Sequence, residues 1–252
     1  MIIQLYYSID EFMNIAIILA GGTGERMKTK TVPKQFLLVA GKPIIVYTLE
    51  KFQSSSDIDQ IIIVCKNDYK KILQDYILKY GISKVVSVVE GGETRHKSLF
   101  NGVKEAYSIS NNENDIVLIH DAVRPAVSLG LISDVIIQTN KHNACMAVGR
   151  PIETIVLINE EGFVSEVKNR YICRTGKAPH AYKIGLINSI FKKAEADGNM
   201  DYIDDESMMY AYGIPIFTVD CPDENIKITN RMDYNVFRSF IWTMEDLQFQ
   251  DD

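Results

Sequence analysis

The segment IAIILAGGTGERM at residues 15–27 decides the fold class of this 252-residue chain. Its first part, Ile15–Ala20, is a continuous apolar run without the alternation of a strand that has one face in water. Such a run is typical of a parallel strand that is covered by helices on both faces. The glycines that follow let backbone amides approach a ligand closely. The segment therefore predicts a buried parallel strand that ends in a ligand-binding loop.

Strands of the same kind recur along the chain at intervals long enough for a helix. Further strands are expected at Gln60–Cys65, Val85–Val89, Ile116–His120, Ala144–Gly149 and Ile214–Asp220. Helices are expected at Pro43–Phe52, Asn67–Lys79, Arg95–Tyr107 with Thr94 as N-cap, Leu129–Thr139, Ile184–Ala196, Ser207–Tyr212 and Arg231–Leu247. This alternation predicts an α/β fold, a Rossmann-like and mostly parallel open sheet with helices on both faces.

The pattern changes after Pro151. Two short strand candidates lie at Glu153–Asn159 and Phe163–Val167, around the turn sequence Glu160-Glu161-Gly162. They predict a β-hairpin arm, at about residues 151–178, inserted into the α/β body. Because an isolated hairpin is marginally stable in water, we expect it to pack on something, such as another subunit. The expected organisation is an extension of unknown role at residues 1–12 and a single domain at 13–252.

The composition is that of an ordinary globular protein. Apolar residues make up 46% and charged residues 24%, which excludes collagen-like, disordered and disulfide-scaffold proteins. The formal net charge of -6 predicts no general basic face, so we expect neither nucleic acid nor a membrane as a partner. We find no signal peptide, no spanning run of about 18 apolar residues, and no clustered Cys and His ligands for zinc. A cytoplasmic location with reduced cysteines is expected.

The spacing of the glycine loop distinguishes three kinds of phosphate-binding site. A dinucleotide-binding loop would continue as G-x-G-x-x-G, but Met27 stands where the third glycine is needed. A Walker loop would need Gly-Lys-Ser/Thr after four residues, and this triplet is absent. What remains is a nest of amides with two cations, Arg26 inside the loop and Lys34 shortly after it. Two cations beside such a nest suit a triphosphate.

Five segments, in order along the chain, resemble one enzyme family. They are Leu19–Met27 with Pro33-Lys34-Gln35, Gly91–Arg95 with Ser98, HDAVRP at 120–125, Asn169-Arg170, and ENIKIT at 224–229. The first looks like the nucleotidyltransferase signature LAGGxGxRM…PKQ, and the HDAxRP and NIKIT segments are more specific. Over about residues 14–245 the chain resembles the cytidylyltransferases acting on 2-C-methyl-D-erythritol 4-phosphate and on ribitol 5-phosphate. The resemblance implies a fold of the nucleotide-diphospho-sugar transferase type.

The resemblance also implies a reaction. CTP and an alditol phosphate would give a CDP-alditol and pyrophosphate, with Mg²⁺ as the cofactor. Because the substrate phosphate attacks the α-phosphorus in line, the protein contributes mainly positioning and charge neutralisation. The residues that the resemblance assigns to catalysis are Arg26, Lys34 and Lys227. Those assigned to CTP binding are Ala20, Gly21, Gly22, Thr23, Gly24, Gly92, Arg95 and Ser98.

A second group of residues is expected to bind the acceptor. Asp121 stands at the carboxyl end of the fourth strand, where α/β sheets bind ligands, and is a candidate ligand of Mg²⁺. By resemblance it contacts the alditol, and Arg124 lies near the same molecule. Thr154 and Arg170 belong to the arm, and the resemblance places them in the active site of a second subunit. This implies a homodimer with shared sites.

The acceptor half departs from the family's pattern. Where the family usually reads Thr-Pro-Gln, this chain has Ala178-Pro179-His180, and Arg174 and Lys177 add two positive charges just upstream. The acidic stretch Asp204–Ser207 is close to that of the family. The altered segment favours ribitol 5-phosphate or a related polyol phosphate, a precursor of polymers or capsules. The isoprenoid precursor 2-C-methyl-D-erythritol 4-phosphate remains open as the acceptor.

Two other functions fit the glycine loop. A hexose 1-phosphate nucleotidyltransferase that uses UTP or GTP would share this loop, although the HDAxRP and NIKIT segments argue against it. A non-catalytic nucleotide-binding relative is permitted by the altered acceptor segment, since a fold does not fix a function. A panel of nucleotides in a pyrophosphate-release assay separates these alternatives from a cytidylyltransferase.

Overall fold

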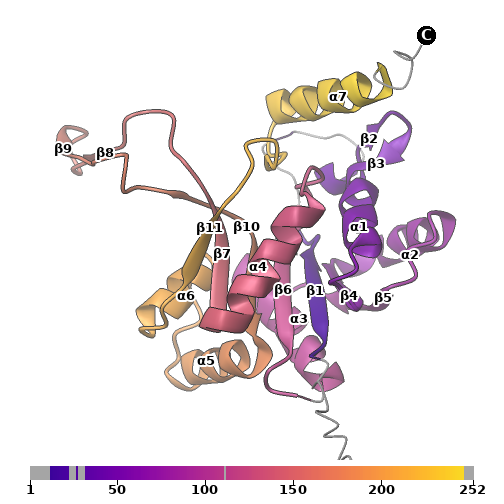
Figure 1. Cartoon of the computed structure of the whole chain (residues 1–252), viewed down its shortest axis with the longest axis horizontal. Helices are drawn as coiled ribbons and strands as arrows, with labels where there is room; N and C mark the ends of the chain where they lie inside the picture. The colour runs from indigo at the N-terminus through magenta and orange to yellow at the C-terminus, as the bar shows by residue number, and fades with distance from the viewer. Residues whose placement is uncertain (1–11, 23–26, 28–31, 111, 247–252) are drawn as a thin grey trace, which may run out of the picture.

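A seven-stranded sheet runs through the centre of the chain in the order β11-β7-β10-β6-β1-β4-β5 (Figure 1). The structure, a computed structural model, describes residues 12–22, 27, 32–110 and 112–246. The strands are β1 (Asn14–Leu19), β4 (Gln60–Cys65), β5 (Val85–Glu90), β6 (Ile116–Asp121), β7 (Ala144–Gly149), β10 (Thr175–Lys183) and β11 (Phe217–Asp220). All pairings are parallel except those of β10, which runs antiparallel to β6 and β7.

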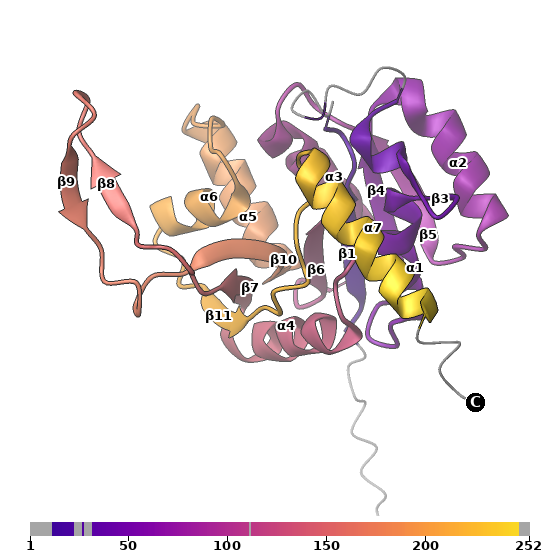
Figure 2. The same cartoon turned by 90° about the horizontal axis from the view of Figure 1, so that it is seen from above.

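Helices cover both faces of this sheet (Figures 1 and 2). They are α1 (Ile44–Ser54), α2 (Lys70–Lys79), α3 (Arg95–Ile109), α4 (Leu129–His142), α5 (Ile184–Ala196), α6 (Asp205–Ala211) and α7 (Arg231–Asp246). One apolar cluster joins Ala16 and Ile18 of β1 to α1, α2 and α4, and the other joins Ile15 and Ile17 to α3, α5 and α6. Because β1 is buried on both faces, its apolar run does not alternate. The predicted fold class is confirmed.

In Figure 1, the short strands β2 and β3 and the last helix α7 lie above the central sheet. A 3-10 helix, η2 (Lys34–Phe36), precedes the small hairpin β2 (Leu38–Val39) and β3 (Lys42–Pro43), and η3 (Asn67–Tyr69) precedes α2. The last helix, α7, packs against α1, where the rings of Tyr47 and Phe237 meet edge to face with centroids 5.3 Å apart. In the described part of the chain, every helix is too short or too polar to cross a membrane.

Strand β10 was not predicted from the sequence. Pro179 in its middle has no N–H to donate to a neighbouring strand, and proline normally argues against a central strand. The structure accommodates it with an irregularity, because the register with β7 shifts between Lys177 and His180. As a result, β10 lies directly beside β6, the strand that ends in Asp121, and His180 stands opposite Ile119 of β6.

The predicted arm is a hairpin that projects from the body (Figures 1 and 2). It consists of β8 (Val156–Ile158) and β9 (Val164–Val167), and Gly162 takes the left-handed conformation in its turn, with φ of +90°. The first strand is shorter than predicted, and residues 175–178 of the predicted arm belong to β10 instead.

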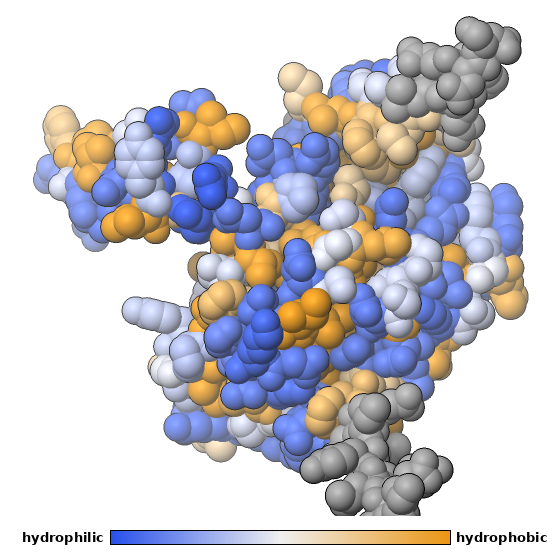
Figure 3. Space-filling view, viewed as in Figure 1, coloured by the Kyte–Doolittle hydropathy of each residue, from blue (hydrophilic) through white to orange (hydrophobic). Residues whose placement is uncertain are grey.

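The arm exposes an unusual share of apolar side chains, which Figure 3 shows in orange on the projecting part of the molecule. They are Ile152, Val156, Leu157, Ile158, Phe163, Val164, Val167, Tyr171 and Ile172. So many exposed apolar side chains on one projecting element are typical of an interaction site.

Candidate active site

A cavity of about 580 Å³ lies at the carboxyl ends of β1, β4, β5 and β6. From β1 the chain continues to β4 on one side of the sheet, and β6 is added later on the other side of β1. Open α/β sheets bind ligands at a point where the strand order reverses in this way. The predicted site residues that line this cavity are Ala20, Gly21, Gly22, Lys34, Gly92, Arg95, Ser98, Asp121 and Lys227. The predicted residues Thr23, Gly24 and Arg26 lie outside the described residues.

Gln35 holds the start of the glycine loop. Its side-chain amide donates to the carbonyl oxygens of Ala20, at 2.6 Å, and Gly22, at 3.1 Å, and the residue is buried. Because Gln35 follows Lys34 in the same 3-10 helix, these bonds also hold Lys34 next to the glycine loop. Sequence reasoning missed this role, although the Pro33-Lys34-Gln35 triplet was its signal.

The opposite wall of the cavity is the start of α3. Thr94 caps this helix, as predicted, by accepting from the amide of Lys97 at 3.1 Å. The Ser98 hydroxyl accepts from the amide of Gly92 at 3.0 Å, which holds the loop before the helix. A Cβ at Gly92 would stand 2.5 Å from that of Lys97, so this position requires glycine. Ser98 thus fixes the loop at Gly92, and the sequence predicts that both residues contact CTP.

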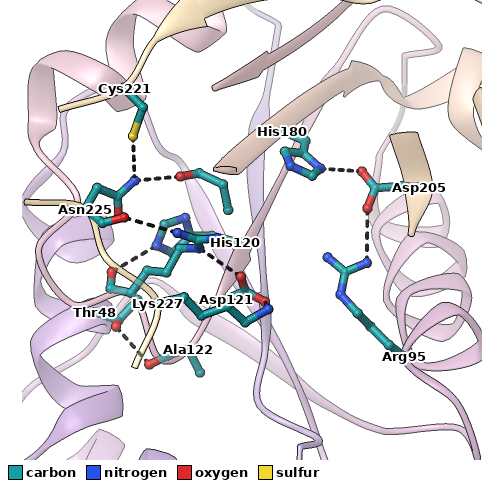
Figure 4. Close-up of polar contacts among 12 residues, drawn as sticks. Thr48, Arg95, His120, Asp121, Ala122, His180, Asp205, Cys221, Asn225 and Lys227 are labelled. Carbon is teal, nitrogen blue, oxygen red and sulfur yellow. Dashed lines mark hydrogen bonds and ion pairs between the residues drawn. The ribbon is translucent and has the colours of Figure 1, made fainter. Parts of the chain in front are cut away.

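Asp121 pairs with two cations at the floor of the site (Figure 4). Its Oδ2 accepts from Nε of Arg124 and its Oδ1 from Nζ of Lys227, each at 3.0 Å. The carboxylate is 10% exposed. Burial alone would raise the pKa of Asp121, but Lys227 and then Arg124 outweigh it and hold the pKa well below its ordinary value. Asp121 therefore stays ionised and fixes the two cations in place.

Buried polar side chains support this pair. Asn225 is fully buried; its side-chain amide donates to the carbonyl of Ala178 at 2.7 Å, and its backbone carbonyl accepts from Nη1 of Arg124 at 3.1 Å (Figure 4). Nε2 of His120 lies 3.1 Å from the carbonyl of Arg124. Burial lowers the pKa of His120 to about 4, so the ring is neutral and Nε2 carries the donated proton. Sequence reasoning identified the segments of both residues but not these roles.

A second cavity of about 220 Å³ adjoins the first, since Arg95, Asp121 and Lys227 line both. The other residues of its lining are Arg124, Gly176, Lys177, Ala178, His180, Ile203, Asp204 and Glu206. The structure thus collects two predicted acceptor residues, Asp121 and Arg124, and the altered residues Ala178 and His180 around one space.

Beneath the second cavity, Asp205 is fully buried and accepts from three donors. His180 donates through Nδ1 to Oδ2 at 2.7 Å, and Nη1 of Arg95 lies 3.4 Å from Oδ1 (Figure 4). The hydroxyl of Tyr182 also donates to Oδ2, at 2.9 Å. Together with Glu206, His180 and Asp205 offer donor atoms within 4.8 Å of one another, close enough to hold a metal ion. Because Nδ1 of His180 carries the proton that it donates to Asp205, this nitrogen has no lone pair to offer a metal ion, and we interpret the cluster as an ion-pair network.

This network makes stability depend on pH. Burial alone would lower the pKa of His180, but the Asp205 carboxylate outweighs it and, with a smaller contribution from Glu206, raises the pKa from 6.5 to about 9. A raised pKa contributes stability that is complete below pH 6.5 and is lost as the pH rises through about 9. Burial likewise raises the pKa of Glu206, from 4.5 to about 7. Titration of Glu206 therefore also lowers the stability as the pH rises, over the range from 4.5 to about 7.

The melting temperature is therefore expected to fall between pH 6.5 and 9. One proton changes the free energy of unfolding by at most about 1.4 kcal/mol per pH unit. Thermal unfolding at a series of pH values measures the slope, and His180→Gln should make it shallower. A wild-type melting temperature that stays level or rises over this range would contradict the assignment of a charged His180.

The arm residues lie apart from both cavities. Thr154 and Arg170 are exposed, and neither belongs to the described residues that line these two cavities. Nη1 of Arg170 donates to the carbonyl of Ile152 at 2.9 Å, within the arm itself. A role for them in the active site thus requires a second subunit, which stays a prediction.

Known proteins resemble this chain over nearly all of its length. The family model described as IspD, 2-C-methyl-D-erythritol 4-phosphate cytidylyltransferase, matches residues 14–242. A ribitol-5-phosphate cytidylyltransferase of Vibrio parahaemolyticus is 39% identical over 239 residues, which cover 94% of this chain and 99% of that protein. A 2-C-methyl-D-erythritol 4-phosphate cytidylyltransferase of Clostridium botulinum is 36% identical over 220 residues, or 87% of this chain and 93% of that protein.

A solved structure agrees with the fold. The crystal structure of the 4-diphosphocytidyl-2C-methyl-D-erythritol synthase of Anaerococcus prevotii superposes with a TM-score of 0.79 at 27% identity. The match covers 93% of this chain and 98% of that one. The resemblance read from the five sequence segments is confirmed. The chain belongs to the IspD family of cytidylyltransferases and is a nucleotidyltransferase that acts on a sugar alcohol phosphate.

Proposed function

We propose that this enzyme transfers CMP from CTP to ribitol 5-phosphate, giving CDP-ribitol and pyrophosphate in the cytoplasm. The observation that carries the proposal is the pair of adjoining cavities, which share Arg95, Asp121 and Lys227. A transferase that joins two phosphorylated substrates needs this arrangement, with a cation between the two sites. The higher identity to the relative named for ribitol 5-phosphate, 39% against 36%, supports the choice of acceptor.

The residues of the larger cavity suit the charge of a triphosphate. Lys34, Lys66, Arg95 and Lys227 line it, against two carboxylates, Glu93 and Asp121. In the proposed reaction an oxygen of the acceptor phosphate forms a bond to the α-phosphorus. The bond from that phosphorus to the bridging oxygen breaks, and pyrophosphate leaves with the electron pair. Lys34 and Lys227 neutralise the charge that gathers around the phosphorus.

We further propose Mg²⁺ as the cofactor. Asp121 is the ionised carboxylate common to both cavities, but its oxygens already accept from Arg124 and Lys227. Such a donor set fits an ion that takes most of its oxygens from the phosphates of the nucleotide, as Mg²⁺ usually does. When bound, the ion would neutralise part of the triphosphate charge. The protein would orient the ion through Asp121.

Pyrophosphate release tests the acceptor. With saturating CTP and Mg²⁺, we expect ribitol 5-phosphate to give a kcat/KM at least about tenfold above that of 2-C-methyl-D-erythritol 4-phosphate. UTP and GTP in place of CTP serve as nucleotide controls and should give little product. A preference for the branched tetritol would assign the enzyme to isoprenoid supply instead. Absence of turnover with both acceptors would remove the proposed reaction.

We also propose that the enzyme acts as a homodimer whose arms exchange. The exposed apolar side chains of β8 and β9 support this proposal, as does the fact that Arg170 lines neither of the two cavities described for its own chain. In such a dimer each site would combine Lys34 of one subunit with Thr154 and Arg170 of the other.

Mixed dimers test the shared site. Lys34→Ala and Arg170→Ala should each be nearly inactive alone, because every site of either homodimer lacks one residue. After unfolding, mixing and refolding, half of the dimers are mixed and each of these has one intact site, so about a quarter of wild-type activity should return. Light scattering supplies the control for assembly. A mixture no more active than its parents, or a purely monomeric active enzyme, would refute the exchange.

A further inference from the structure

Glu206 is one of the charged residues of the second cavity that the proposed reaction leaves without a role; Lys177 and Asp204 are two others. It is the second residue of α6 and lines the cavity together with Arg124, Lys177 and His180. Its side chain is 23% exposed, so the carboxylate is partly withdrawn from water yet reachable from the cavity. Burial is also the largest cause of its raised pKa, about 7.

The carboxylate of Glu206 lacks a hydrogen-bond donor on one side. Its Oε2 lies 3.3 Å from Nδ1 of His180, but the single proton on that nitrogen is given to Asp205 at 2.7 Å. Oε2 therefore has no hydrogen-bond partner among the described residues, and it is also buried. Because Oε2 is buried, a ligand in the cavity meets this carboxylate at its other oxygen, Oε1, which lies on the side of Gly176. A hydrogen bond donated to Oε1 would stabilise a carboxylate whose buried oxygen has no donor of its own.

The space next to this carboxylate is kept open by a glycine. A Cβ at Gly176 would stand 3.2 Å from Oε1 of Glu206 and would crowd that oxygen. Gly176 and Glu206 line the same cavity, on β10 and α6 respectively. The cavity therefore admits a ligand group beside the carboxylate where a larger side chain would exclude it.

The charges of the cavity set the direction of its ligand. Lys227 lines both cavities, so the acceptor phosphate must lie at that end, next to the α-phosphorus. Arg124, held by Asp121, stands at the same end. Asp204 and Glu206 belong to the residues that line the second cavity alone, and they offer hydrogen-bond acceptors to the rest of the molecule. Asp204 already accepts from the amide and the hydroxyl of Ser207, which leaves Glu206 as the carboxylate to which a polyol chain would bring a hydroxyl donor.

We propose that Glu206 is a specificity-determining residue, which accepts a hydrogen bond from a hydroxyl of the acceptor chain remote from its phosphate. The inference rests on the proposed function and deepens it, since it names the group that distinguishes a long hydroxylated chain from a short one. A site built around a hydroxyl rejects an analogue that lacks it, because its own polar group is then left unpaired.

A truncation series tests this pairing. The acceptors are ribitol 5-phosphate, erythritol 4-phosphate and glycerol 3-phosphate, each with saturating CTP, in the wild type, Glu206→Ala and Glu206→Gln. For Glu206→Ala we expect kcat/KM to fall about tenfold or more with ribitol 5-phosphate and by less than about twofold with glycerol 3-phosphate. Glu206→Gln, which keeps an acceptor oxygen, should lie between the alanine variant and the wild type. The KM for CTP should stay unchanged.

Matched controls separate the proposal from a structural effect and from failure of the proposed function. Glu195→Gln, at an exposed position of α5, should behave as the wild type with every acceptor. An equal loss with all three acceptors, or a raised KM for CTP, would mean that Glu206 only supports the network around His180 and would overturn the inference. If the wild type itself turns over none of the polyol phosphates, the proposed function fails first, independently of any variant.

Discussion

Replacing Lys34 by alanine should lower kcat for CTP-dependent transfer by about two to three orders of magnitude. The ammonium group lines the larger cavity beside the glycine loop, where the triphosphate would gain charge at the bridging oxygen in the transition state. The fold should survive, because Gln35 rather than Lys34 makes the buried bonds to Ala20 and Gly22. Pyrophosphate release at saturating CTP measures the rate, and thermal unfolding checks the fold.

A lysine outside both cavities supplies the control for this experiment. Lys51→Ala, at an exposed position of α1, removes the same charge without touching either cavity and should keep the wild-type rate. Arg26→Ala should resemble Lys34→Ala, by the same reasoning from the glycine loop. If Lys34→Ala retained nearly the wild-type kcat and KM, the assignment of the larger cavity to the triphosphate would be wrong.

Local patterns account for what could be predicted of the fold. The run Ile15–Ala20 and the strand Gln60–Cys65 are buried on both faces, and an apolar run without alternation shows this directly in the sequence. Strand β10 shows the opposite case. Its middle holds Pro179, and its place between β6 and β7 depends on pairings with residues far away in the chain, such as His180 with Met146. A proline in the sequence argues against such a strand, and only the tertiary structure overrides that preference.

In the site, too, residues within local sequence motifs could be predicted, whereas residues whose contacts lie far away in the chain could not. Lys34, Asp121 and Lys227 could be assigned because each lies in a segment that resembles a family motif, and all three line one cavity. Asp205 could not be assigned. Its partners are His180, 25 residues away, and Arg95, 110 residues away, and each separation reflects how the chain folds rather than any spacing in the sequence. The sequence indicated that Asp205 stands near the start of a helix, in an acidic stretch close to that of the family, but it did not indicate which side chains contact Asp205.

The buried network around Asp205 predicts the largest loss of stability. Asp205→Ala removes the acceptor of His180, Tyr182 and Arg95 at a fully buried position. Breaking a buried ion pair by removing one partner costs about 3–5 kcal/mol, because the other charge stays buried. Here Glu206, 3.3 Å from His180, would take over part of the interaction, so we expect a value near the lower end. The melting temperature should fall by roughly 6–12 °C.

The same variant also tests the cause of the pH dependence. Without the Asp205 carboxylate, burial would dominate and the pKa of His180 would fall back toward its ordinary value. Asp205→Ala should therefore lose most of the decline in melting temperature between pH 6.5 and 9, in addition to being less stable at neutral pH. Asp201→Ala, an exposed carboxylate just before α6, is the matched control and should keep both the wild-type melting temperature and its slope. A loss of stability in Asp205→Ala that leaves the slope intact would mean that the carboxylate acts through packing and hydrogen bonds. A loss of both would show that it acts through the charge it shares with His180, which ties the stability of the fold to the wall of the acceptor cavity.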